Sequence, residues 1–290
     1  MSSTLAVRVW FVVMCLALPA QAWAQGSERL LAAERQWDDK VGLDQRIVGG
    51  KPVTLKDNPW QIALVSARVP SNLVGQFCGG SIIAPRWVAT AAHCVDRGTE
   101  PKQIQILTST ESLEKGGTRI NATRILVHEN WTPKTNDFDI ALIEVASDLV
   151  GTGSAAAAIP GDTSAAEHPA TLQVRVTGWG RTSMSTNAGS KLLQGIEIPY
   201  VTRAVCNRPA SYDGDITENM ICAGIQKGGV DSCQGDSGGP ATAMVSGTRR
   251  LVGIVSWGEG CALRDKYGVY TNISKFGPWV AEKTGGAVKW

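Results

Sequence analysis

Residues 235–256 read GDSGGPATAMVSGTRRLVGIVS. This stretch places Ser237 in a glycine-rich turn that ends at Pro240, and two short apolar runs follow at 239–245 and 251–256. Short runs rich in Val, Ile and Thr, bounded by turn-forming residues, are typical of antiparallel β-strands. The stretch therefore predicts a β-rich fold in which an accessible serine hydroxyl stands at the start of a strand.

Other short runs of the same composition are spread along the chain. They lie at residues 60–66, 81–84, 103–107 and 140–145 and, after a stretch rich in Gly, Ser and Ala at 151–158, at 173–177, 193–199 and 268–272. The sequence predicts an all-β chain with two β units joined near residues 151–160. Pro278, at a favourable first helical position ahead of Gly285 and Gly286, predicts one short C-terminal helix.

Length and charge exclude few classes of protein. The 290 residues are enough to bury a substantial apolar core. Lys and Arg number 28 against 26 Asp and Glu, so the formal net charge is +2. This balance argues against nucleic acid or a membrane surface as a partner.

The first residues resemble a targeting segment. Arg8 precedes an apolar run at 9–18, and small residues around Trp23 form a cleavage signal, which predicts a signal peptide over 1–24. The run is too short for a membrane span, which needs roughly 20 residues. We expect export to an extracellular or periplasmic compartment. The charged, cysteine-free segment 25–46 that follows has little to bury.

Cysteine usage supports an oxidising compartment. Of the seven cysteines, Cys15 belongs to the predicted signal peptide, and six remain: Cys78, Cys94, Cys206, Cys222, Cys233 and Cys261. Six cysteines suggest three disulfides, whose pairing their spacing alone does not assign. A zinc site is the weaker alternative because the cysteines do not form the close pairs of a zinc ribbon.

A serine hydroxyl becomes a nucleophile only beside a base that an acid orients. Among three histidines, His93 follows an apolar run and stands beside a cysteine, whereas His128 and His168 lie in polar segments. Asp139 opens an apolar strand, where a carboxylate can be held in place. Taken singly, the three residues could equally be a turn serine, a core histidine and a strand cap.

Four motifs together resemble the chymotrypsin and trypsin family of serine proteases. They are residues 47–50 (IVGG) and the segments around His93, Asp139 and Ser237, in this order and at these separations. The resemblance covers roughly residues 47–284. It implies two antiparallel β-barrels, which we place at 47–156 and 157–290, the second with the short helix.

The resemblance also implies a mechanism. His93 is expected to take the proton of Ser237 as the hydroxyl attacks a peptide carbonyl, and Asp139 to orient the imidazole. The backbone N–H groups of Gly235 and Ser237 are expected to bind the developing oxyanion.

The same resemblance implies a substrate pocket. Asp231, six residues before Ser237, is expected at its floor, where a carboxylate favours Arg or Lys in the substrate. The alternative is that Asp231 is a solvated loop acid. The other expected binding residues are Ser232, Ser256, Trp257, Gly258 and Gly268.

The junction of Arg46 and Ile47 resembles the family's activation site. Cleavage there is expected to remove a propeptide over 25–46 and to free the amino group of Ile47, which then pairs with Asp236. We expect a zymogen, and since the site ends in Arg, autoactivation is a hypothesis.

The family pattern pairs Cys78 with Cys94, Cys206 with Cys222, and Cys233 with Cys261. No cofactor or metal is expected, because the loop that binds calcium in many trypsins has no clear counterpart at 108–118, although it contains Glu111 and Glu114. Tyr267 stands where many trypsins carry proline and resembles relatives that bind sodium near the pocket, so sodium binding is a hypothesis.

The expected partners are protein or peptide substrates with Arg or Lys at the cleavage site, and protein protease inhibitors. Nucleic acid and membranes are not expected partners, and a monomer is expected. The alternative from another class is a catalytically inactive protease-like binding protein. Within the enzyme class, a broad degradative role is preferred over narrow processing, since the chain has almost no long insertions.

Overall fold

The computed structural model describes residues 50–96, 98–149, 159–162, 168–180, 189–228, 235–260 and 263–290. The chain divides into a unit of residues 1–42, which lies outside the described residues, and a unit of residues 43–290, to which every element below belongs. The signal peptide, the propeptide and the boundary near residue 156 therefore stay predictions. No helix in the described part of the chain is both long enough and apolar enough to cross a membrane.

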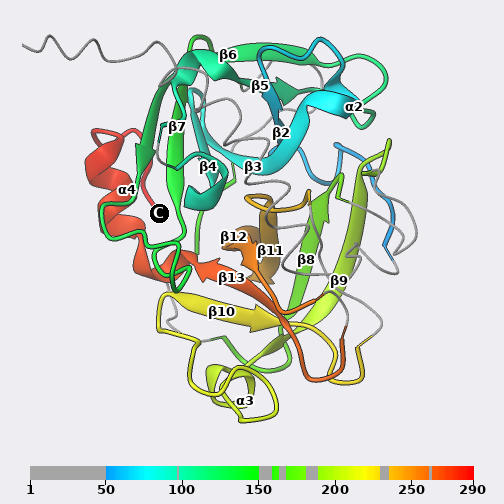
Figure 1. Cartoon of the computed structure of the whole chain (residues 1–290), viewed down its shortest axis with the longest axis vertical. Coiled ribbons are helices and arrows are strands. Elements are labelled where there is room, and N and C mark those ends of the chain that lie inside the picture. Colours follow the sequence, from blue (N-terminus) through cyan, green and yellow to red (C-terminus); the bar gives the residue numbers. More distant parts are fainter. Residues whose placement is uncertain are drawn as a thin grey trace, which may run out of the picture. The chain divides into compact units, whose positions relative to one another are not determined.

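Six antiparallel strands close the first barrel, in the order β2-β3-β4-β7-β6-β5 (Figure 1). Their bounds are β2 (Gln61–Ser66), β3 (Gln76–Ala84), β4 (Trp87–Thr90), β5 (Ile104–Thr108), β6 (Thr118–Val127) and β7 (Ala141–Val145). A short helix, α2 (Asn72–Gly75), and two single turns, η2 (Ala92–Cys94) and η3 (Pro101–Gln103), lie between these strands.

Six further strands form a second closed barrel, since β8 and β9 pair with each other at the two ends of the order β9-β10-β13-β12-β11-β8. Their bounds are β8 (Gln173–Gly178), β9 (Gln194–Val201), β10 (Met220–Ala223), β11 (Pro240–Val245), β12 (Thr248–Trp257) and β13 (Gly268–Asn272). The short β1 (Lys51–Pro52) adds to β9. The prediction of two antiparallel β-barrels is confirmed.

The helices of the second half are short: α3 (Arg203–Cys206), η4 (Ile273–Lys275) and α4 (Gly277–Lys283). The predicted C-terminal helix is α4, and Pro278 lies in its first turn, where a missing N–H costs no hydrogen bond.

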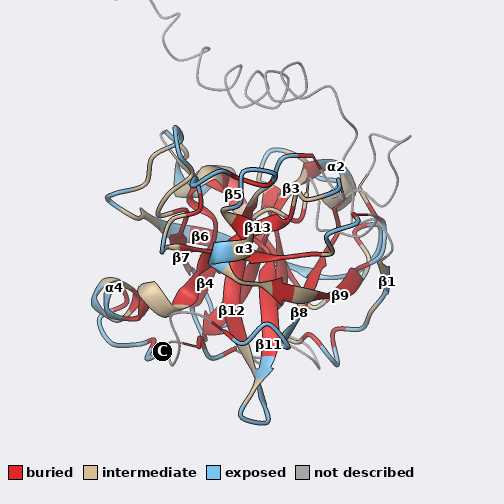
Figure 2. Ribbon diagram, turned by 90° about the horizontal axis from the view of Figure 1, so that it is seen from below, coloured by how far each residue is buried: buried red, intermediate tan, exposed pale blue. Residues whose placement is uncertain are grey.

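Burial explains the apolar run at 251–255 in strand β12. Val252 and Val255 belong to the core of the second barrel, whereas Leu251 and Ile254 belong to a core that also contains side chains of the first barrel and of α4. The strand is therefore buried on both faces, as Figure 2 shows by its colour. A register shift opposite Ala241 and Thr242 gives β12 one extra residue, so residues three apart, rather than alternate residues, share a core here.

The two residues of the turn between β11 and β12 explain its conformation. Val245 pairs with Thr248, which leaves Ser246 and Gly247 as a two-residue turn. Both have positive φ, 49° and 78°, as a type I′ turn requires.

Four strands, β1, β4, β6 and β10, lie outside the apolar runs from which strands were predicted. In β6, polar and half-exposed positions such as Arg119, Asn121 and Arg124 interrupt the apolar pattern. Pairing with β5 and β7, rather than local composition, makes this segment a strand.

Two of the three expected disulfides lie within the described residues. Cys78 in β3 is bonded to Cys94 at the end of η2, and Cys206 in α3 is bonded to Cys222 in β10. Both expected pairings are confirmed. Cys233 and Cys261 lie outside the described residues.

Candidate active site

The turn that carries His93 is fixed at both ends. Strand β4 ends at Thr90, and the single turn η2 follows directly. The disulfide from Cys94 to Cys78 attaches the far end of this turn to β3. The His93 side chain remains 27% exposed. The imidazole is thus held by a rigid turn while one edge stays accessible.

Asp139, which is almost completely buried, holds the imidazole through its carboxylate. Oδ1 accepts a hydrogen bond from the His93 backbone N–H at 2.9 Å, and Oδ2 lies 2.8 Å from His93 Nδ1. When Nδ1 donates to Asp139, the neutral ring presents Nε2 as an acceptor, which is the tautomer a general base needs.

Two side chains of the second barrel hold Asp139. The Ser256 hydroxyl donates to Oδ2 at 2.5 Å, and the Thr271 hydroxyl donates to the Asp139 carbonyl at 2.6 Å. Phe138, the preceding residue, has a φ of 56°, an uncommon backbone conformation that is often found beside functional residues. The carboxylate is therefore fixed by both barrels.

These contacts change the pKa of His93. Burial acts to lower it, but the negative charge of Asp139, the hydrogen bond that His93 donates to that carboxylate and the charge of Asp96 outweigh burial, so the pKa of His93 lies above its ordinary value of 6.5. An Asp139 carboxylate that stabilises the charged imidazole in this way favours proton uptake by His93.

Ser237 lies in a turn packed between the barrels. Its carbonyl accepts from Gly79 N of β3 at 2.8 Å, and the next residue, Gly238, donates to the carbonyl of Val255 in β12 at 2.8 Å. Gly238 has a φ of 78°, and a Cβ there would overlap the hydroxyl of Thr90. The serine turn therefore packs directly on the end of the strand that leads to His93.

Among the described residues, no hydrogen bond joins Ser237 Oγ to His93 Nε2, and Nε2 lies 3.7 Å from Cys94 Sγ. Catalytic hydrogen bonds are often long in structures without substrate and shorten when it binds. The structure thus joins His93 to Asp139 directly, and brings Ser237 to them through its turn.

Asp236 is fully buried beside two glycines. Its Oδ1 accepts from Gly180 N at 2.9 Å, and a Cβ at either Gly178 or Gly180 would overlap the carboxylate. These two glycines did not figure in the sequence analysis, although the run Gly178-Trp179-Gly180 is a signal that could have found them. Arg46 and Ile47, the other expected activation residues, lie outside the described residues.

The end of β12 and the start of β13, where a pocket wall is expected, lie side by side. Trp257 pairs with Val269, and the ring of Tyr212 meets the Trp257 indole edge to face at 5.0 Å. Around Gly258, the nearest atoms to an added Cβ lie at 3.6–3.8 Å, so one methyl group there would be in ordinary van der Waals contact with its neighbours. Gly268 is buried in β13, while Asp231 and Ser232 lie outside the described residues.

Tyr212 joins the two sides of this wall and was not predicted from sequence. Its hydroxyl donates to the Tyr267 carbonyl at 2.5 Å and accepts from Glu259 N at 3.3 Å. Burial raises the pKa of Tyr267, whose side chain packs against Gly224.

The two loop glutamates have separate protein partners. Glu111 Oε1 accepts from Leu55 N at 2.8 Å, and Glu114 forms an ion pair with Lys191 at 2.7 Å. Elsewhere in the described chain, Cys78, His93 and Cys94 form the one group of three side chains close enough to hold a metal. Since the two sulfurs are bonded to each other, they offer no thiolate to an ion.

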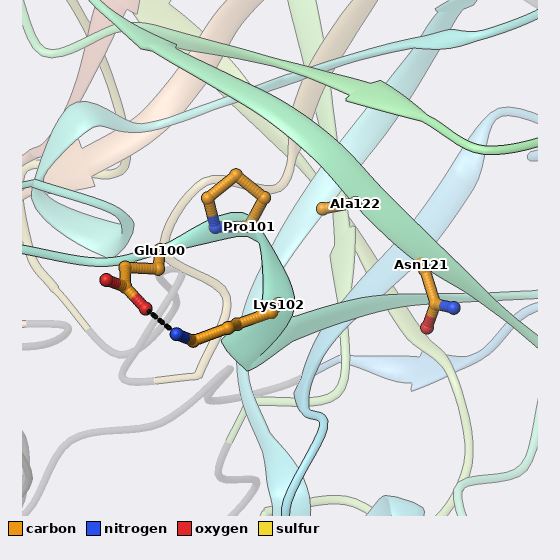
Figure 3. Close-up of a pocket in the computed structure, with 5 residues that line it drawn as sticks. All are labelled: Glu100, Pro101, Lys102, Asn121 and Ala122. Carbon is orange, nitrogen blue, oxygen red and sulfur yellow. Dashed lines mark ion pairs between the residues drawn. The ribbon is translucent and has the colours of Figure 1, made fainter.

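An open hollow on the first barrel contains none of the expected site residues. It has a volume of about 620 Å³ and is lined by Glu100, Pro101, Lys102, Asn121 and Ala122 (Figure 3). The polar groups there are the exposed ion pair of Lys102 with Glu100 and the Asn121 amide. Its shallow surface lacks the convergent polar groups of a catalytic site.

Comparison with known proteins points to one family. The family model described as Trypsin matches residues 47–280. Trypsin Blo t 3 of Blomia tropicalis is 40% identical over 239 residues, which cover 82% of this chain and 85% of the relative. Anionic trypsin of Canis lupus familiaris is 39% identical over 242 residues, which cover 82% of this chain and 89% of the relative.

The comparisons agree with the two barrels and with the motifs that the structure brings together between them. The chain belongs to the trypsin family of serine proteases.

Proposed function

We propose that this chain is an active endopeptidase, secreted as a zymogen, that cleaves peptide bonds after Arg or Lys with Ser237 as its nucleophile. The observation that carries the proposal is the buried Asp139 carboxylate, which accepts two hydrogen bonds from His93 and one from Ser256. An inactive binding protein has no need to hold a histidine in the tautomer of a general base.

In the proposed reaction, Ser237 Oγ attacks the substrate carbonyl carbon while His93 Nε2 takes the hydroxyl proton. The tetrahedral intermediate collapses as His93 gives this proton to the leaving amine, and an acyl-enzyme remains. Water then attacks the ester, again with His93 as base, and releases the acid and Ser237. Asp139 stays ionised throughout and stabilises the imidazolium.

The backbone N–H groups of Gly235 and Ser237 are the proposed oxyanion donors. Support comes from the φ of Gly235, 92°, a conformation that glycine adopts without strain. Loss of one such donor typically lowers kcat by about 100- to 1,000-fold.

Preference for Arg or Lys is proposed from the position of Asp231, six residues before Ser237. The hydrogen bond from the Tyr212 hydroxyl to the Tyr267 carbonyl, which joins the segments beside Gly258, supports a binding site at this place. The names of both relatives contain the word trypsin. A buried carboxylate would pair with a substrate cation and would be left unpaired by an apolar side chain.

Activation by cleavage after Arg46 is proposed from the surroundings of Asp236. A fully buried carboxylate between two glycines is suited to a buried cationic partner, and the freed amino group of Ile47 would supply one. Secretion, action as a monomer and inhibition by protein inhibitors are proposed with it. If trace active enzyme fails to process the purified precursor, autoactivation is wrong.

The decisive experiment uses precursor cleaved after Arg46 and three peptide substrates that differ only in Arg, Lys or Phe before the scissile bond. We expect hydrolysis of the Arg and Lys peptides and little hydrolysis of the Phe peptide. The Ser237→Ala variant, cleaved in the same way, is the control and should be inactive. Equal cleavage of the Phe peptide would overturn the role of Asp231, and activity in the variant would overturn the nucleophile.

A further inference from the structure

Gln76, at the start of β3 in the first barrel, contacts the turn that precedes Ser237 in the second. Its side-chain Nε2 donates to the carbonyl of Gly235 at 2.9 Å and to the carbonyl of Cys78 at 3.3 Å. Both acceptors are carbonyl oxygens, so only the amide nitrogen can face them, and the orientation of the amide is determined.

Without the hydrogen bond from Gln76, the backbone torsions of Gly235 could change easily. With no Cβ and a φ of 92°, it has a wide choice of backbone conformations. It also packs closely on Gly180, whose Cα lies 3.0 Å from the position of a Gly235 Cβ. Gly180 N in turn donates to the Asp236 carboxylate. The segment from Gly235 to Asp236 is therefore held by contacts with both Gln76 and Gly180.

We infer that Gln76 is a positioning residue for the oxyanion site: its hydrogen bond to the Gly235 carbonyl holds this glycine with its N–H directed at the developing oxyanion. Anchoring the carbonyl restrains one of the two torsions that direct the Gly235 N–H. This inference rests on the proposed function, and adds to it a side chain that never touches substrate.

A positioning role of this kind acts on the transition state. Substrate side chains bind elsewhere, so KM should change little, whereas the tetrahedral oxyanion loses part of its stabilisation. Since a single hydrogen bond in a protein is modest in net free energy, we expect kcat to fall by about 3- to 10-fold.

The test uses enzyme cleaved after Arg46, with Gln76→Leu and Gln76→Glu as variants. Leucine keeps similar bulk without a donor, and glutamate keeps the shape but places a carboxylate against two carbonyl oxygens. Gln173→Leu, at an exposed position of β8, is the matched control. Titration of active sites normalises kcat to correctly folded enzyme, so partial misfolding of one variant does not imitate the effect.

A pair of peptide ligands separates transition-state from ground-state binding. When a peptide aldehyde ending in Arg binds, Ser237 Oγ adds to its carbonyl carbon. The electron pair of the carbonyl π bond moves to the oxygen, which becomes the oxyanion, and the hydroxyl proton passes to His93. The corresponding peptide alcohol fills the same pocket but cannot form this adduct. We expect both Gln76 variants to bind the aldehyde about 3- to 10-fold more weakly and the alcohol with unchanged affinity.

The outcomes distinguish the two proposals. If the cleaved wild-type chain hydrolyses none of the peptides, the proposed function itself fails. If wild type is active but both variants keep kcat and aldehyde affinity within twofold of Gln173→Leu, the role of Gln76 is wrong. A loss shared equally by aldehyde and alcohol would also overturn it, because Gln76 would then support the pocket as a whole.

Discussion

Asp139 illustrates how much of the site depends on single side chains. Its carboxylate is buried, yet each of its contacts is a hydrogen bond: the backbone N–H and Nδ1 of His93, and the hydroxyl of Ser256. A buried carboxylate without such donors would be costly to ionise. Ser256, expected to contact substrate backbone, thus also supports the acid that orients the base.

Replacing Ser256 with alanine removes one donor from Asp139 Oδ2. We expect kcat/KM to fall by about 5- to 20-fold, because a charge-assisted hydrogen bond is lost from a buried carboxylate. The measurement is steady-state hydrolysis of the Arg peptide by cleaved enzyme. Ser147→Ala, at an exposed position after β7, is the control. Equal values for the two variants would contradict the role of Ser256.

The raised pKa of His93 predicts the acidic limb of the pH profile. His93 must be neutral to act as base, so kcat/KM should fall as the pH drops through a pKa above 6.5. The Asp139→Asn variant lacks the negative charge that raises the pKa of His93, while burial still lowers this pKa, so the acidic limb should move to lower pH. We also expect kcat to fall by about 10⁴-fold. The exposed Asp148→Asn is the control. An unmoved limb would show that Asp139 does not set this pKa.

At the scale of elements, glycines decide where segments meet. Strand β8 ends at Gly178, and Gly180 follows two residues later, at the Asp236 carboxylate. Gly247 serves only backbone conformation: it lies in the turn between β11 and β12 and has no heavy atom within 4 Å of an added Cβ.

Gly180→Ala should therefore differ from Gly247→Ala. The first places a methyl group on the Asp236 carboxylate, and we expect kcat/KM of the cleaved enzyme to fall by at least about 100-fold as the oxyanion turn shifts. The second meets no neighbour, and we expect activity to remain with a stability loss of about 1–2 kcal/mol. Peptide hydrolysis and urea unfolding measure the two effects. Full activity in Gly180→Ala would refute the close packing at Asp236.

Helix α4 is attached to the loop before β7 by an exposed cluster. Glu129 forms an ion pair with Lys283 at 2.5 Å and accepts from Trp279 Nε1 at 2.8 Å. The hydrogen bond from Lys283, the backbone of Glu129 and the Trp279 indole lower the pKa of Glu129 to about 2. The ring of His128 lies at 4.8 Å from both Trp279 and Phe138, beside this cluster.

Glu129→Gln should lower stability in a pH-dependent way. A carboxyl group with a lowered folded pKa stabilises the protein above its unfolded pKa of 4.5, and this contribution disappears as the pH falls towards 2. Because the pair is exposed, we expect Tm to fall by only about 1–2 °C at pH 6 and not at all near pH 2. Both proteins carry Ser237→Ala to prevent autolysis. A difference that persists at pH 2 would mean that packing, rather than charge, is lost.

At the scale of the whole molecule, one apolar cluster joins the interior of the first barrel to β12 and to the C-terminal helix. Phe276, between η4 and α4, is 1% exposed and belongs to the cluster that includes Leu251 of β12 and the interior of the first barrel. Asp137 adds a polar link, since it accepts hydrogen bonds from Thr217 and Asn219. The site lies between two barrels that are packed together by shared apolar burial.

Phe276→Ala should destabilise this shared core strongly. We expect the free energy of unfolding to fall by about 3–5 kcal/mol, since removal of a buried aromatic ring leaves a cavity. Urea unfolding in the Ser237→Ala background gives the value, and Leu263→Ala, at a 38% exposed position, should change it by less than about 1 kcal/mol. A loss below about 1 kcal/mol in Phe276→Ala would contradict the shared core.

The sequence by itself determined the β class, the short C-terminal helix and the residues proposed for chemistry, because apolar runs, turn residues and the motifs around His93, Asp139 and Ser237 are local patterns. Strand β6 was not predicted, because its polar residues interrupt the apolar pattern that indicates a strand. Only the tertiary structure decided that Ser256 supports Asp139, 117 residues away, and that Gln76 holds Gly235, 159 residues away. Such hydrogen bonds depend on how two closed barrels pack against each other, and no local pattern of residues encodes that packing.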